Sequence, residues 1–227
     1  MSDGTPSTRD PQRDAFLLQM YREMWNNVNR HLSIVWQSAG VLAGAFAIFA
    51  LVEKKTLSID LASALIVVIA SWLVAHTYDA NAWFNRNLVI VANIERQFLT
   101  TNDSRDIHYF FTRHRAGNNM VGHLQIHRNL GMGIAALVVL YHFVTRVVPG
   151  FGQPVSQIDF ERSLPYLTAF VCVWWIRRFR RERIKNHEEF LRRSPGSTFA
   201  AASESPVSDH APADDRGAGR ASAPGSS

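Results

Sequence analysis

The sequence contains very little cysteine, and it lacks the short motifs that mark common enzyme and nucleotide sites. Cys172 is the single cysteine among 227 residues, so the chain can form neither an internal disulfide nor a cysteine-based metal site. No GxGxxG, P-loop, HExxH or GxSxG pattern occurs. We therefore assign no catalytic residue, expect no cofactor and favour a protein without enzymatic activity.

Charge is missing from long stretches of the chain. Hydrophobic residues make up 47% and charged residues 19%, but long uncharged runs alternate with strongly charged ones. A soluble domain mixes the two kinds at helical or strand spacing. Four apolar runs suit a bilayer span by length or by flanking residues, at 33–52, 59–78, 130–148 and 164–176. The sequence predicts an all-α integral membrane protein with four transmembrane helices.

The two ends of the chain lack large apolar residues. Residues 1–14 are polar and have no apolar core of a signal peptide, so we expect a disordered N-terminus. Residues 194–227 consist mainly of Ser, Ala, Pro, Gly and Asp, which predicts a disordered tail. The alanine and arginine bias of this tail is typical of a GC-rich bacterial gene. The membrane domain is expected at 15–193.

Lysine and arginine are unevenly distributed between the segments that flank the four runs. The N-terminal, middle and C-terminal segments hold 20 of these residues, whereas the two short loops hold 4. The positive-inside rule then places both termini and the middle segment in the cytoplasm. We expect a multi-pass protein of the cytoplasmic membrane.

The stretch WFNRNLVIVANIERQFL at 83–99 is amphipathic at helical spacing. One side carries Phe84, Leu88, Val91, Ile94 and Phe98, and the other carries Asn85, Arg86, Asn93, Arg96 and Gln97. No proline or glycine separates it from the second apolar run, which predicts one continuous helix. Similar apolar stripes flank the other runs, so we expect a cytoplasmic helical bundle. The alternative is that these helices lie flat on the lipid surface.

Two polar residues break the apolar side of this predicted stalk. Asn87 and Glu95 lie on or beside it, and a buried carboxylate needs a partner or water. We expect an ion pair between Glu95 and an arginine, with Arg128, Arg30 and Arg22 as candidates. Asn87, Glu95 and Arg128 form the candidate polar site. The functional alternative is a proton, ion or ligand site at the membrane mouth.

Histidines and aromatic residues cluster in the middle segment. His123 and His127 are four residues apart and would share a helix face, as two metal ligands would. Ordinary packing is the preferred interpretation, because the adjacent glutamate of HExxH is missing. A second cluster combines rings and arginines, as interaction surfaces do, and comprises Tyr109, Phe110, Phe111, Arg113 and Arg115. It is a candidate surface for a cytoplasmic protein partner, and capping of the stalk is the alternative.

A basic run follows the fourth apolar run directly. It comprises Arg177, Arg178, Arg180, Arg181, Arg183 and Lys185. Basic residues beside a span attract anionic lipid head groups, which we expect to be partners. Any basic run can also bind nucleic acid, but the adjacent span argues against that interpretation here.

The segments LLQMYREMWNNVNR and RNLVIVANIERQFL flank the first predicted membrane hairpin. With Asn87, Ile94 and Glu95 as matching positions, this layout resembles the RipA-like and SLATT-like small bacterial membrane proteins. The resemblance covers roughly the first 100 residues, and the second hairpin at 130–176 departs from it. It implies an oligomeric membrane protein with no enzymatic activity assigned.

Three functions remain as hypotheses. The first is a self-associating scaffold or effector, since Gly40 and Gly44 form a GxxxG pattern in the first span. The second is a small transporter or channel, with His76, His142 and Gln37 as the polar residues of its spans. The third is a metal-dependent membrane enzyme that uses Glu95, His123 and His127.

Overall fold

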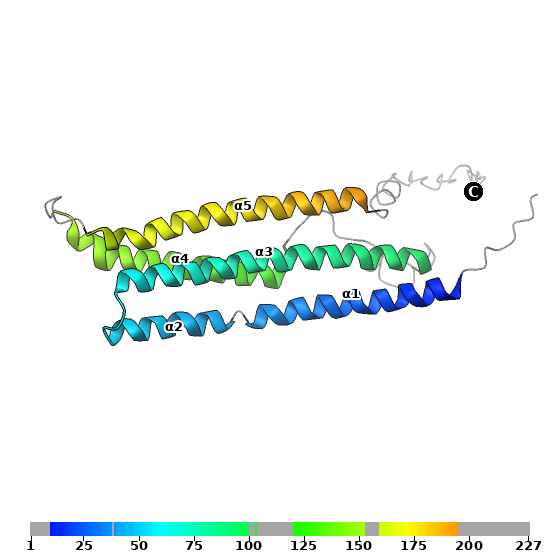
Figure 1. Ribbon diagram of the computed structural model, residues 1–227, viewed down its shortest axis with the longest axis horizontal. Helices are drawn as coiled ribbons and strands as arrows, with labels where there is room; N and C mark the ends of the chain where they lie inside the picture. The colour runs from blue at the N-terminus through cyan, green and yellow to red at the C-terminus, as the bar shows by residue number, and fades with distance from the viewer. Residues whose placement is uncertain (1–9, 38, 100–102, 104–119, 153–158, 195–227) are drawn as a thin grey trace, which may run out of the picture.

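The structure, a computed structural model, describes residues 10–37, 39–99, 103, 120–152 and 159–194. Within these residues every regular element is helical and none is a strand, as the all-α prediction requires. The helices run side by side along one long axis (Figure 1). The predicted interaction surface at 109–115 lies outside the described residues.

Helix α3 (Ile59–Phe98) is the central element of the bundle, and α1, α2, α4 and α5 all pack against it. It begins where the Ser58 side chain accepts a hydrogen bond from the backbone of Leu61. No glycine or proline interrupts its 40 residues, so nothing ends the helix where the second apolar run stops. The prediction of one continuous helix from the second apolar run into the 83–99 stretch is confirmed as far as Phe98.

Helices α1 (Pro11–Gln37) and α2 (Ala39–Glu53) lie end to end along α3 (Figure 1). The first predicted span is therefore divided between the end of α1 and α2. Helix α1 begins within the segment expected to be disordered, because Asp10 accepts a hydrogen bond from Gln12 and Pro11 suits a first helical position. Its packing on α3 favours the bundle over a helix lying flat on lipid.

Helix α4 (Gly122–His142) crosses α3 closely at Gly131. A Cβ atom placed on Gly131 would lie 3.0 Å from Val74 Cγ2 and 3.2 Å from the Ala70 carbonyl oxygen. A side chain at this position would require Val74 or the Ala70 carbonyl to move by a few tenths of an ångström. Beyond His142 the chain continues as the π-helical turn η3 (Phe143–Val147) and the 3-10 turn η4 (Val148–Gly150).

Helix α5 (Leu164–Arg193) follows the short turn η6 (Phe160–Ser163) and runs along α3 on the side away from α1 (Figure 1). Two helical stretches are long and apolar enough to cross a bilayer, Ile59–Phe98 and Gly122–Gly150. The apolar part of α2, Ala43–Glu53, is shorter. Four apolar stretches nevertheless lie together at one end of the bundle, in α2, the first half of α3, α4 and the first half of α5 (Figure 1).

Large apolar side chains are exposed over this same end. On α4 and α5 they include Leu137, Leu140, Leu167, Phe170 and Trp174, with exposed fractions between 56% and 73%. The few buried apolar residues are mostly on α3, which the other helices surround. This half of the bundle therefore has an apolar exterior as well as an apolar interior.

Candidate functional site

A buried cluster of ionisable residues joins α3, α4 and α5 at the apolar end of the bundle. Asp60 in the first turn of α3 is 1% exposed, and His142 at the end of α4 is fully buried. His142 Nε2 lies 2.7 Å from Asp60 Oδ1, and His142 Nδ1 lies 2.9 Å from the Tyr166 hydroxyl oxygen. An ionised Asp60 only accepts, so Nε2 carries a proton and donates to it. Nδ1 accepts from the Tyr166 hydroxyl when the imidazole is neutral and donates to it when the imidazole is protonated.

Arg146 completes this cluster with two hydrogen bonds to the same carboxylate. Its Nη2 donates to Asp60 Oδ2 at 2.9 Å and its Nε donates to Oδ1 at 3.3 Å. This bidentate ion pair compensates the buried negative charge of Asp60. Arg162 donates to the Arg146 carbonyl oxygen and lies 3.5 Å from Asp159, which connects the cluster to the surface.

Local structure explains why these four residues meet. Asp60 directly follows the residue that starts α3, and Tyr166 lies in the first turn of α5 after Pro165. The π-helical turn η3 begins immediately after His142 and contains Arg146. Turns of this kind often occur at functional sites. Three helix ends thus deliver the four side chains to one point.

Sequence reasoning missed this cluster. His142 is one of the polar span residues of the transporter hypothesis, but Asp60, Arg146 and Tyr166 are not among the predicted site residues. The available signal was His142 followed four residues later by Arg146 in an otherwise apolar run. Ionisable residues inside apolar segments usually pair with one another and mark functional sites. Nothing in the sequence links them to Asp60, which lies 82 residues before His142.

A second buried carboxylate lies at the other end of α3. Glu95 is 6% exposed, and its Oε1 accepts a hydrogen bond of 3.1 Å from the Tyr21 hydroxyl of α1. Its Oε2 is buried and has no hydrogen-bond partner among the described residues. The partner is thus a phenol from α1 and not the arginine expected from the sequence.

This environment changes the acidity of Glu95. Burial raises the pKa of Glu95 to about 7, and the hydrogen bond from Tyr21 and the charge of Arg96 oppose the increase. Burial also raises the pKa of Tyr21 and lowers the pKa of Arg96. The carboxyl group is therefore poised to gain or lose a proton near neutral pH.

The remaining members of the predicted stalk site do not gather around Glu95. Arg128 donates to Asn129 and lines a cavity with Tyr78 and Asn81, about 20 Å along α3 from Glu95. Asn87 is buried, as expected from its position on the helix. Asn85, which we assigned to the polar side, is also buried, because α3 is covered by neighbours on several sides.

His123 and His127, the predicted histidine pair, lie in the first two turns of α4. The His123 ring packs edge-on against Phe84 of α3, with 6.4 Å between ring centroids. Within the part of the chain that the structure describes, no three His, Cys, Asp or Glu side chains gather as a metal site would need. His123 and His127 therefore remain a two-residue candidate.

The basic run divides into two groups on α5. Arg177, Arg178, Arg180, Arg181 and Lys185 are exposed. Arg183 faces α3 and lies 3.3 Å from Asp79. Arg180 is exposed but also lies over the Tyr78 ring of α3, with 5.8 Å between the guanidinium carbon and the ring centre. The other exposed residues suit contact with anionic lipid, whereas Arg183 belongs to the interface between the two helices.

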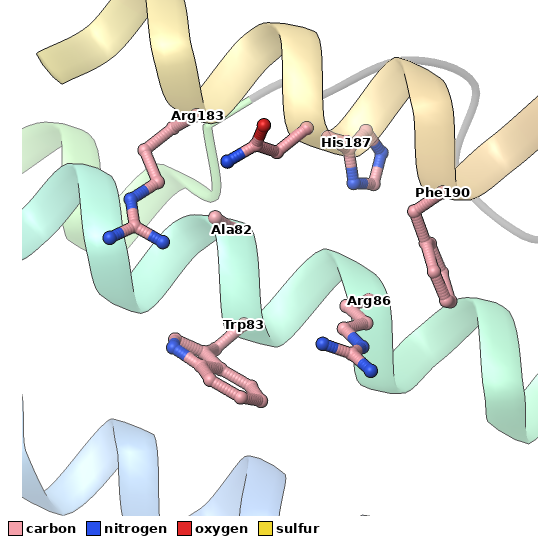
Figure 2. Close-up of a pocket in the computed structure, with 7 residues that line it drawn as sticks. Ala82, Trp83, Arg86, Arg183, His187 and Phe190 are labelled. Carbon is pink, nitrogen blue, oxygen red and sulfur yellow. The ribbon is translucent and has the colours of Figure 1, made fainter.

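A small cavity lies beside Arg183, between α3 and α5 (Figure 2). Its volume is about 160 Å³, and its lining includes Trp83, Arg86, Arg183, Asn186, His187 and Phe190. It combines aromatic walls with cationic groups.

Comparison of the chain with protein families, with curated proteins and with solved structures gives no match.

Proposed function

We propose that this protein is a four-span membrane protein that self-associates and presents a helical bundle to partners on the cytoplasmic side. The observation that carries the proposal is the position of the exposed large apolar side chains. Most of them lie on α2, α4 and the first halves of α3 and α5, and on α5 they stop at Trp175. Phe16 and Leu18 of α1 and Trp83 of α3 are exposed outside this region. Lipid is the solvent that accepts such a surface at low cost, since apolar area exposed to water is unfavourable.

The predicted third and fourth spans belong to this surface. The exposed side chains of α5 between Leu164 and Trp175 are apolar, although the arginines that follow make α5 as a whole too polar to qualify as a span. Trp174 and Trp175 suit the interfacial belt, and Arg177 and Arg178 suit the head-group layer. The charge asymmetry then puts both termini in the cytoplasm.

Self-association is supported by surfaces that the chain does not use internally. A Cβ atom on Gly40 or Gly44 would meet nothing within 4 Å, so this small-residue face of the first span is open to another helix. The resemblance at Asn87, Ile94 and Glu95 to RipA-like and SLATT-like proteins implies an oligomer as well. All three of these residues are buried on α3.

Light scattering of the detergent-solubilised particle tests this proposal. We expect a defined multiple of the chain mass for the wild type and a shift to smaller particles for Gly40→Leu/Gly44→Leu. Gly133→Leu is the control, because Gly133 also has open space around it but lies on α4. A monomer in several mild detergents would contradict self-association. Labelling of cysteines placed in the 54–58 loop and in the 194–227 segment, in a Cys172→Ser background, tests whether these segments lie on opposite sides.

A small transporter or channel is the second candidate, and the Asp60 cluster favours it. A buried aspartate paired with a histidine inside an apolar bundle is typical of ion and proton pathways. Proton flux into reconstituted vesicles would test this function. Flux that Asp60→Asn and His142→Ala abolish, with the particle mass unchanged, would favour the transporter over the scaffold.

A further inference from the structure

The cavity between α3 and α5 is lined by the exposed side chain of Arg86, whose guanidinium packs against two aromatic rings. The Arg86 guanidinium carbon lies 5.3 Å from the centre of the Trp83 ring and 5.1 Å from that of Phe190. Aromatic rings attract the cation but cannot accept the in-plane hydrogen bonds of its N–H groups. In the described part of the chain Arg86 has no hydrogen bond and no ion pair.

A second guanidinium lines the same cavity from α5. Arg183 packs over Phe179, with 4.8 Å between the guanidinium carbon and the ring centre, and its Nη2 lies 3.3 Å from Asp79. Its Nε is buried and has no hydrogen-bond partner in the described residues. Two arginines thus line the cavity, and one of them lies beside Asp79, which is not part of the lining. His187, which is 4% exposed, adds an imidazole ring to its wall (Figure 2).

The position of the cavity relative to the predicted spans restricts its ligand. The second predicted span ends at residue 78, so Ala82 and Arg86 lie about 6 and 12 Å beyond it along α3. Lipid head groups occupy this layer. On α5 the cavity begins at Arg183, seven residues after the end of the fourth predicted span.

We propose that this cavity binds a phosphate group through Arg86 and Arg183. Guanidinium groups match phosphate oxygens with paired, charge-assisted hydrogen bonds. Among the described residues no protein group accepts from Arg86, and the buried Arg183 Nε has no hydrogen-bond partner. The volume of about 160 Å³ is adequate for one phosphate. At this height the group comes from an anionic lipid head group, although a soluble phosphate monoester offers the same chemistry. The lipid source rests on the proposed membrane function.

Native mass spectrometry of the full-length protein in neutral detergent tests the site. Dioleoyl phosphatidate is added as the lipid probe and glycerol 3-phosphate as the soluble probe. We expect saturable binding, with the apparent Kd raised about tenfold or more in Arg86→Gln and in Arg183→Gln. Competition by glycerol 3-phosphate would identify a soluble monoester as the ligand. Phosphatidate binding without competition would identify the lipid head group.

Arg178→Gln is the matched control, because Arg178 belongs to the same basic run, is exposed and lies outside the cavity. All three variants lose one positive charge, so a merely electrostatic attraction predicts the same loss in each. Equal losses in the three variants, or no binding of either probe to the wild type, would overturn the proposal. If Arg86→Gln melts at a lower temperature than the wild type, Arg86→Lys replaces it as the test variant. Lysine keeps the positive charge but lacks the planar guanidinium, so we expect it to bind phosphate more weakly than arginine does.

The outcome separates this inference from the proposed function. Binding of glycerol 3-phosphate that depends on Arg86, by a protein that carbonate extracts from membranes, would disprove membrane insertion and retain the phosphate site. A protein that carbonate does not extract and that binds neither probe would retain the membrane proposal and disprove the phosphate site.

Discussion

The Tyr21 hydroxyl of α1 donates a hydrogen bond of 3.1 Å to Glu95 Oε1 of α3, and this phenol and carboxyl group lie 74 residues apart in the sequence. The contact connects the first helix to the far end of the central one. Because Glu95 is buried and its second oxygen has no partner in the described residues, the interface is sensitive to the protonation of one group.

The stability of this interface should depend on pH. The pKa of Glu95 is about 7 in the folded protein, above its ordinary value of 4.5. Between these values the unfolded chain loses the proton and the folded chain keeps it, so stability decreases as pH rises and is constant above about 7. The full shift corresponds to about 3 kcal/mol, and partial solvent access reduces the expected decrease in unfolding free energy to about 2 kcal/mol. We expect Glu95→Gln to remove most of it. Denaturant unfolding in detergent from pH 4 to 8 measures this dependence of the unfolding free energy on pH. Glu23→Gln, on the exposed part of α1, should leave the profile unchanged.

Tyr21→Phe should move the titration of Glu95 to higher pH. The hydrogen bond from Tyr21 lowers the pKa of Glu95, so its loss leaves burial less opposed and the pKa above about 7. Infrared difference spectra of the carboxyl band during a pH titration follow this group directly. An unchanged or lower midpoint in Tyr21→Phe would contradict the assigned contact.

Gly131 and Gly133 should respond oppositely to alanine. A methyl group at Gly131 would approach the Ala70 carbonyl to 3.2 Å, whereas Gly133 has open space. We expect Gly131→Ala to destabilise the protein by about 1–3 kcal/mol through overpacking. Gly133→Ala should be neutral or stabilising by up to about 1 kcal/mol, since alanine favours helix. Thermal melting of the two variants in the same detergent decides the matter, and similar shifts would argue against the close crossing of α3 and α4.

Asp60→Asn should be much more damaging than Asp159→Asn. Asp60 holds both Arg146 and His142 in a buried site, and its neutral replacement leaves the arginine without its counter-ion. We expect Asp60→Asn to lower the free energy of unfolding by about 2–3 kcal/mol. This is below the range for fully buried pairs because Arg146 is partly exposed. Asp159 is exposed and lies 4.0 Å from Arg146, so its loss should cost less than about 0.5 kcal/mol. In the double variant Asp60→Asn/Arg146→Gln the loss should be smaller than the sum of the single ones.

The helices were predictable from local signals, but their neighbours were not. The continuity of α3 followed from the lack of glycine and proline across Ile59–Phe98. The burial of Asn85 did not, because periodicity locates one apolar side and does not tell how many helices surround a central one. The start of α1 at Pro11 had a usable signal in Asp10–Pro11, which was outweighed by the polar composition of the segment.

The candidate site depended on contacts that sequence distance conceals. Glu95 was correctly recognised as a carboxylate on the buried side of its helix. Its partner was expected to be an arginine, because opposite charge is the usual partner of a buried acid, whereas α1 supplies Tyr21. The Asp60, His142, Arg146 and Tyr166 cluster required the knowledge that three helix ends converge.

Helix α3 carries Asp60 in its first turn and Glu95 in its last. The two residues are 35 positions apart on one unbroken helix, which corresponds to about 50 Å. A helix without a hinge turns and slides as a unit. A rotation of α3 that weakens the hydrogen bonds of His142 and Arg146 to Asp60 must therefore also turn Glu95 relative to Tyr21. The two carboxylates are thus mechanically linked along the central helix.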